Sequence, residues 1–88
     1  MTTLKNPVRK KRESLNLGVQ ELAEQAGITL GTLRMVEGGA YLHLSQLLAD
    51  RLASVFPDVA PEHLKEEYTA WHRRIEVERQ QRSQKRNR

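Results

Sequence analysis

Apolar residues recur at helical spacing along most of this 88-residue chain, and no stretch alternates strictly as a half-buried β-strand would. The clearest stripe follows the spacing i, i+3, i+4, i+7: Val19, Leu22, Ala23, Ala26. Such spacing places all of its members on one side of a helix. The pattern predicts five helical segments and therefore an all-α fold.

Capping residues mark where the first three segments begin and end. Asn6 can cap a helix that has Pro7 at its first position, where no backbone N–H is missed. Gly27 can end the second helix by adopting the left-handed conformation. Thr29 can cap the third helix, in which Leu33 and Val36 face inward. The pair of glycines at 38 and 39 then ends this helix.

Two further segments follow a loop at residues 40–43. The fourth has a broad apolar face: Leu44, Leu47, Leu48, Leu52, Val55, Phe56. Pro57 and Asp58 break it, and Pro61 suits the start of a fifth helix. The fifth stripe has spacings 4-3-4: Leu64, Tyr68, Trp71, Ile75. Apolar periodicity ends at Glu78, so the following basic residues are expected to form a frayed or disordered tail.

These segments indicate one small domain with extensions at both ends. The predicted divisions are an N-terminal arm at 1–5, a compact domain at 6–65, a C-terminal helix extension at 66–78 and a basic disordered tail at 79–88. A domain of this size is marginally stable alone, so a partner or a second copy would help.

Composition restricts the cellular setting. The chain contains no cysteine, which excludes disulfides and thiolate metal sites and fits a reducing compartment. No apolar run approaches the roughly 18 residues that span a bilayer. The basic N-terminus lacks the apolar stretch of a signal peptide. We therefore expect a cytoplasmic protein that does not contact a membrane.

Charge is unevenly distributed. Residues 1–13 carry five Lys or Arg against one acid, and residues 72–88 carry seven against two. The stretch between them has three basic residues against eight acidic ones. Clustered cations suit a polyanion, of which nucleic acid is the commonest. The alternative is a solvated helix face followed by an unstructured tail.

The second and third segments, joined by a short turn containing glycine, fit a helix-turn-helix unit. In such a unit the inner side of the second helix is held by the domain, and its outer side is free for a DNA major groove. An ordinary helical hairpin within a bundle is the alternative. The residues themselves favour the helix-turn-helix unit. The run from Leu17 to Gly39, which carries the evidence, reads LGVQELAEQAGITLGTLRMVEGG.

This run resembles the lambda-repressor-like (Xre/Cro-type) family of helix-turn-helix DNA-binding domains. The matching positions are Leu17, Leu22-Ala23, Ala26-Gly27, Ile28, Thr29, Leu33, Val36-Glu37 and Gly39. The resemblance covers about residues 5 to 65 and implies a five-helix lambda-repressor-like domain that binds double-stranded DNA. The extended C-terminal helix lies outside it.

The resemblance also implies contact residues. Base contacts would come from the outer side of the third segment: Leu30, Gly31, Thr32, Arg34, Met35. Arg34 is the best candidate, because a guanidinium can bond a guanine edge at two points. Phosphate contacts would come from Val19, Gln20, Thr29, Tyr41, His43, Lys10 and Lys11. Thr29 alternatively serves only as a cap, and Met35 only packs.

The chain departs from the family pattern at several of these positions. Val19 replaces the family's usual glutamine, so Gln20 or backbone N–H groups would have to hold the phosphate. Gly18 replaces a Ser or Thr cap at a cost of a few tenths of a kcal/mol. Gly31 lies inside the recognition helix and costs roughly 1 kcal/mol relative to alanine. The loop after Gly39 lacks the basic residues that the family often has there.

Two structural roles complete the expectations. Arg12 and Glu37 match the family's paired Arg and Glu, which tie the first helix to the third. Tyr68, Trp71 and Ile75 extend beyond the family core. We interpret them as a homodimer or partner seam, although Tyr68 alternatively covers the bundle.

No feature of the sequence indicates catalysis. The three histidines have no paired spacing for a metal, and no glycine loop precedes a helix to hold a phosphate. We therefore expect no enzyme activity, no metal and no cofactor.

The sequence favours a transcriptional regulator, of the phage or mobile-element repressor type, that binds a palindromic operator as a dimer and acts by occupying it. One alternative is a protein-interaction module, an antitoxin or accessory subunit, whose C-terminal helix docks on a partner. The other is RNA binding through the basic ends, against which the few aromatic residues argue.

Overall fold

A computed structural model describes residues 5–86, with side chains through Arg79. Within these residues the chain forms five helices and no strand: α1 Pro7–Ser14, α2 Val19–Ala26, α3 Leu30–Gly38, α4 Gln46–Ala53, α5 Pro61–Arg86. The predicted all-α fold with five helices is confirmed. The N-terminal arm, except for Lys5, and the last two residues of the predicted tail lie outside the described part.

The caps expected from the sequence form at the first three helices. The Asn6 side chain accepts hydrogen bonds from the backbone N–H groups of Val8 and Arg9, at 2.9 and 3.1 Å. Gly27 ends α2 with φ 72°, and Gly39 ends α3 with φ 81°, both left-handed. A residue with a Cβ would be strained at either position. Local sequence therefore fixes the ends of α2 and α3.

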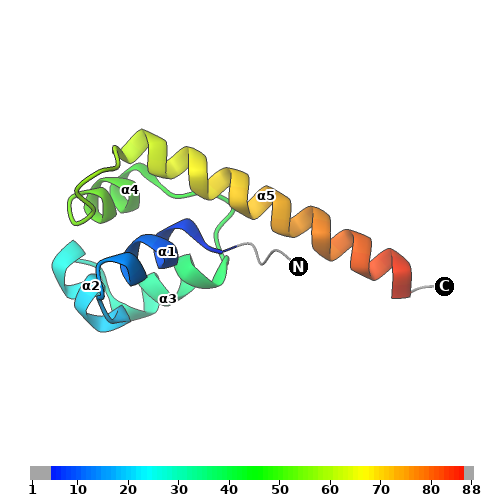
Figure 1. Cartoon of the computed structure of the whole chain (residues 1–88), viewed down its shortest axis with the longest axis horizontal. Coiled ribbons are helices and arrows are strands. Elements are labelled where there is room, and N and C mark those ends of the chain that lie inside the picture. The colour runs from blue at the N-terminus through cyan, green and yellow to red at the C-terminus, as the bar shows by residue number, and fades with distance from the viewer. Residues whose placement is uncertain (1–4, 87–88) are drawn as a thin grey trace.

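The core draws side chains from all five helices and from the loops beside α4. Its fully buried members are Val8, Leu22, Leu33, Val36, Leu44, Ala49, Leu52, Leu64 and Tyr68. Figure 1 shows α1 lying between α3 on one side and α5 on the other. Helices α4 and α1 pack against the N-terminal half of α5, and α3 packs against α1 and α2.

The fourth segment differs in detail from its prediction. Helix α4 begins only at Gln46, with Ser45 as its cap, and Leu44 is buried in the preceding loop. Leu47, assigned to the apolar face, is 61% exposed. The side of α4 that packs on the core carries Leu48, Ala49 and Leu52 at helical spacing, and Leu47 lies outside this stripe.

Helix α5 agrees with one expectation about the C-terminus and corrects another. It runs without a break from Pro61 to Arg86, so residues 66–78 extend the fifth helix as the sequence predicts. Residues 79–86, predicted as disordered tail, are helical. Arg, Gln and Lys are good helix formers, and extending an existing helix avoids the cost of nucleation. The apolar side of α5 therefore ends before the helix does.

The length of α5 gives the molecule its shape. A helix of 26 residues spans about 39 Å, and the molecule measures 47 × 23 × 23 Å. In Figure 1 the C-terminal half of α5 extends beyond the other helices. None of the helices in the described part is long and apolar enough to cross a membrane.

Candidate nucleic-acid interface

The outer side of α3 is open to solvent. Gly31, Arg34, Met35 and Gly38 are exposed or partly exposed, and Leu30 and Thr32 are half-buried. The inner side of the same helix is fully buried through Leu33 and Val36. A three-residue turn, 27–29, joins α3 to α2. The structure thus brings all of the predicted base-contacting residues onto the same short helix.

Two side chains dominate this exposed surface. Arg34 makes no hydrogen bond or ion pair with any described residue, so its guanidinium keeps all of its donors. Met35 is 48% exposed, and the Tyr41 hydroxyl donates to its sulfur at 3.7 Å. Neither Gly31 nor Gly38 would place a Cβ within 4 Å of another atom. The surface is therefore shallow around Arg34.

Thr29 and Thr32 shape the N-terminal end of α3. The Thr29 hydroxyl accepts from the backbone N–H of Thr32 at 3.1 Å and donates to the Thr32 hydroxyl at 2.9 Å. The capping role predicted for Thr29 is thus confirmed. Because its oxygen is engaged in the cap, a phosphate contact by Thr29 would compete with these hydrogen bonds.

The C-terminal end of α3 is held by side chains from the cap of α1 and from α5. Asn6, the cap of α1, donates through Nδ2 to the carbonyl oxygens of Val36 and Glu37 at 3.0 and 3.2 Å. The Tyr68 hydroxyl on α5 donates to the Val36 oxygen at 2.8 Å. His72 Nε2 lies 3.1 Å from the Gly39 oxygen and donates to it. We call Asn6, Tyr68 and His72 the α3 clamp.

The clamp satisfies carbonyls that every helix leaves without partners at its C-terminus. All three clamp residues are buried. Burial raises the pKa of Tyr68 to about 12, with a smaller contribution from the nearby Tyr41. The phenol therefore stays neutral and keeps its proton on the hydrogen bond to Val36.

The predicted ion pair joins α1 to α3. Arg12 Nε and Nη2 donate to the two carboxylate oxygens of Glu37 at 2.8 and 3.1 Å, and Nη1 donates to the Leu17 oxygen at 2.9 Å. Both side chains are only 11% exposed. The hydrogen bond to Glu37 raises the pKa of Arg12 against the opposing effect of burial. This two-point pairing fixes the orientation of α3 on α1.

The N-terminus of α2 offers less to a phosphate than the sequence predicted. The Val19 side chain packs against the core, so only its backbone faces outward. Glu21 accepts from the Gly18 backbone N–H at 2.7 Å and places a carboxylate at the positive end of the helix. Of the residues predicted there, Gln20 alone presents an exposed side chain.

The loop after α3 contains the other predicted phosphate contacts. Tyr41 is half-buried and His43 is exposed. Leu42 between them is 68% exposed, the most of any large apolar side chain in the described part. The loop therefore combines a phenol and an imidazole with an unprotected apolar residue, and carries no Lys or Arg.

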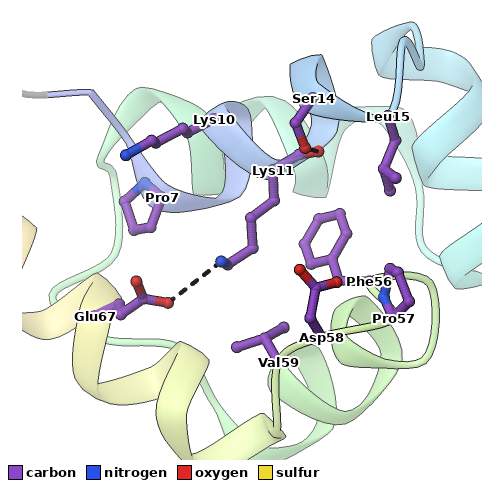
Figure 2. Close-up of a pocket in the computed structure, with 10 residues that line it drawn as sticks. All are labelled: Pro7, Lys10, Lys11, Ser14, Leu15, Phe56, Pro57, Asp58, Val59 and Glu67. Atoms are coloured by element: carbon purple, nitrogen blue, oxygen red, sulfur yellow. Dashed lines mark hydrogen bonds and ion pairs between the residues drawn. The ribbon is translucent and has the colours of Figure 1, made fainter.

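Lys10 and Lys11 lie elsewhere. Figure 2 shows them on the side of α1 that faces α5 and the α4–α5 loop, and Lys11 reaches toward Glu67. The Lys11 Nζ to Glu67 Oε1 distance is 3.7 Å. Because α1 separates this side from α3, the structure does not group the two lysines with the outer side of α3. The phosphate contacts expected of these two lysines stay a prediction.

The predicted seam on α5 also changes. Tyr68 is fully buried and belongs to the clamp, so it cannot form an intermolecular surface. Trp71 is half-buried over Gly39, where an added Cβ would lie 3.1 Å from its ring, so it does not overhang. Ile75 is half-buried and Val77 is 49% exposed. The bundle thus reaches at least to His72 on α5, about two turns beyond residue 65, where the family resemblance ends.

Sequence reasoning misses all three clamp residues in this role. It assigns Tyr68 to the seam or the cover of the bundle, considers His72 only as a metal ligand, and gives Asn6 only the cap of its own helix. A buried polar residue beside an apolar stripe is the available signal, because His72 directly follows Trp71. The carbonyls that these residues cap lie at least thirty positions away along the chain, and no local pattern indicates them.

Neither a search for metal-binding side chains nor comparison with known proteins identifies a further site. Within the described residues no three His, Asp or Glu side chains are grouped so that they could hold a metal ion. Comparison with protein-family models, curated proteins and solved structures finds no match to this chain. The resemblance to the lambda-repressor-like family stays a prediction from the residues themselves.

Proposed function

We propose that the protein is a sequence-specific double-stranded DNA-binding regulator that acts as a repressor by occupying its operator, with α3 as the recognition helix. One observation supports this most. On the outer side of α3, Arg34 has no partner among the described residues, while the inner side and C-terminus of the helix are held rigidly. A recognition element needs both properties, because sequence readout requires free donors and a fixed orientation.

The chemistry of the exposed side matches base edges in a major groove. Arg34 can donate two hydrogen bonds to a guanine, and Met35 or Leu30 can contact a thymine methyl group. Gly31 has no Cβ, so the helix backbone can approach the groove closely at this position. Gln20 and backbone N–H groups of α2 would contact the sugar-phosphate backbone and set the register.

A dimer and a palindromic operator belong to the proposal. Two recognition helices about 34 Å apart would read successive turns of one face of the duplex. Within the predicted seam, Ile75 is the member left for an intermolecular contact, together with the exposed Val77. The distal part of α5 would then serve as the dimerisation arm.

The test is selection of bound duplexes from a random pool, followed by affinity measurements on the selected site. Arg34→Ala is expected to weaken binding to that site by about 1–3 kcal/mol and to relax preference at one base pair per half-site. Arg73→Ala is the matched control, because Arg73 on α5 is also exposed and pairs with no described residue. It should weaken all sequences alike, or none.

Equal effects of the two substitutions would refute α3 as the reading helix. A selected site without two-fold symmetry would refute the dimer while leaving DNA recognition intact.

The second candidate is a protein-interaction module, an antitoxin or accessory subunit. The extension of α5 beyond the other helices favours it, since a projecting helix with Ile75 and Val77 can lie in a groove of a partner. For this candidate no duplex would be enriched from the pool, and Arg34→Ala would change nothing.

A further inference from the structure

We propose that the cleft between α1 and the α4–α5 loop binds a small zwitterion with an apolar side chain, a free α-amino acid of leucine to phenylalanine size. The cleft has a volume of about 230 Å³, equal to about eight water molecules. Sites for drug-sized ligands are usually larger, about 300–1,000 Å³. A cleft of this volume suits a small metabolite.

One wall of the cleft is apolar. Leu15 at the end of α1 is 38% exposed and faces the cleft together with Phe56 and Val59 of the α4–α5 loop. Figure 2 shows these three side chains around the same opening. They provide a surface against which a leucine or phenylalanine side chain can be removed from water.

The rest of the wall carries charges that lack hydrogen bonds. Glu67 Oε1 is shielded from solvent and accepts no hydrogen bond from the described residues, since Lys11 Nζ and His63 Nε2 lie 3.7 and 3.8 Å away. The exposed Asp58 carboxylate also forms no hydrogen bond or ion pair with the described residues, so of the two only Glu67 Oε1 is buried. A buried acceptor of this kind requires a donor.

The arrangement of these charges matches a zwitterion. In Figure 2 the carboxylates of Glu67 and Asp58 lie on either side of the Lys11 ammonium. An amino-acid ammonium can donate to Glu67 Oε1 or to Asp58, and its carboxylate can accept from Lys11. Lys11 and Glu67 already pair with each other at 3.7 Å, which is too long for a hydrogen bond. A zwitterion offers a closer partner of opposite charge to the lysine and to a carboxylate at the same time.

The test is titration of the full-length protein with L-leucine and L-phenylalanine, followed by backbone amide NMR shifts. We expect saturable shifts at millimolar concentrations or below, confined to amides of α1, the α4–α5 loop and the first half of α5. N-acetylphenylalanine lacks the ammonium and phenylalaninamide lacks the carboxylate. Each should bind roughly tenfold more weakly than phenylalanine, or weaker still.

Three variants locate the site. Glu67→Gln and Lys11→Gln should each weaken phenylalanine binding roughly tenfold or more, and Glu66→Gln on the exposed side of α5 should not change it. Circular dichroism verifies that each variant is folded, and either cleft variant suffices if the other unfolds.

Absence of saturable shifts with both amino acids would overturn the proposal. So would equal binding of the acetylated compound, or binding that both cleft variants leave unchanged. The titration contains no DNA, so its result is independent of whether α3 recognises a duplex.

Discussion

The C-terminal ends of α3 and α5 are both helical, but they are held in opposite ways. The end of α3 is surrounded by α1 and α5, and its carbonyls accept hydrogen bonds from the three buried clamp residues Asn6, Tyr68 and His72. The end of α5 extends beyond the bundle. Helical conformation alone therefore does not indicate which segment is fixed by tertiary contacts.

This difference predicts where substitutions are costly. Changes that loosen α3 from the bundle should lower the free energy of unfolding by several kcal/mol. Changes in the distal part of α5 should have little effect on folding and act on association or on DNA binding instead. Four substitutions or deletions test this expectation.

Leu33→Ala should have the largest effect. Leu33 is fully buried on the inner side of α3, and removing its side chain should lower the free energy of unfolding by about 2–5 kcal/mol. Urea denaturation monitored by circular dichroism measures this. Met35→Ala, on the exposed side of the same helix, is the control and should change stability little. Similar losses for both would mean that α3 is not anchored through its inner side.

Arg12→Met should follow, with a loss of about 2–3 kcal/mol. The substitution leaves Glu37 without its two-point partner at a site where the carboxylate is 11% exposed. The double variant Arg12→Met/Glu37→Leu should recover much of the stability, because it removes the uncompensated charge. Arg9→Met breaks an exposed pair with Glu13 within α1 and should cost far less. If the stability losses of Arg12→Met and Glu37→Leu simply added in the double variant, the role assigned to the pair would be contradicted.

Tyr68→Phe should cost about 1 kcal/mol at neutral pH, because it removes one hydrogen bond from the clamp and keeps the ring. The Val36 oxygen still accepts from Asn6. The pKa of Tyr68 is raised to about 12, compared with about 10 in an unfolded chain. Stability from the neutral phenol is therefore complete below about pH 10 and is lost as the pH rises toward 12.

Denaturation of wild type and Tyr68→Phe at several pH values, from neutral to strongly alkaline, separates the Tyr68 phenol from other titrating groups. Lys and Arg titrate in both proteins, so the difference in stability between the two isolates Tyr68. The variant should become the more stable of the two at the alkaline end. A difference that stays constant with pH would show that the phenol is not constrained as the structure indicates.

The bounds of α1, α2 and α3 could be predicted from their local sequence, whereas contacts between segments distant in the chain could not. The capping roles of Asn6, Gly27, Thr29 and Gly39 act within a few residues of their own position, so the sequence indicates each of these caps. The Arg12–Glu37 pair was available only through the family resemblance. Tyr68 and Trp71 were placed on a surface because a stripe shows which side of a helix is apolar and not how far the bundle reaches along it.

The candidate site was predictable to a similar extent. The exposed residues of α3 follow from knowing which two positions face inward, and this periodicity was plain. The position of Lys11 did not follow, because a charge run gives no direction until its helix is packed. The disorder predicted for residues 79–86 was wrong because loss of apolar residues was equated with loss of helix.

Deletion of residues 79–88 should have the smallest effect on folding, below about 0.5 kcal/mol, because the last described side chain, Arg79, is exposed and this part of α5 lies beyond the bundle. The segment nevertheless carries five Lys or Arg residues.

If these residues bind phosphates, their deletion should lower the affinity for all duplexes alike. The slope of log affinity against log salt concentration should become shallower by about 0.9 for each phosphate that the shortened protein no longer neutralises. Filter binding at several salt concentrations, on the selected site and on a scrambled one, measures both. If the shortened protein no longer distinguished the two duplexes, residues 79–88 and not α3 would read the bases. A large decrease in the free energy of unfolding would show that the C-terminal end of α5 is held by tertiary contacts as the end of α3 is.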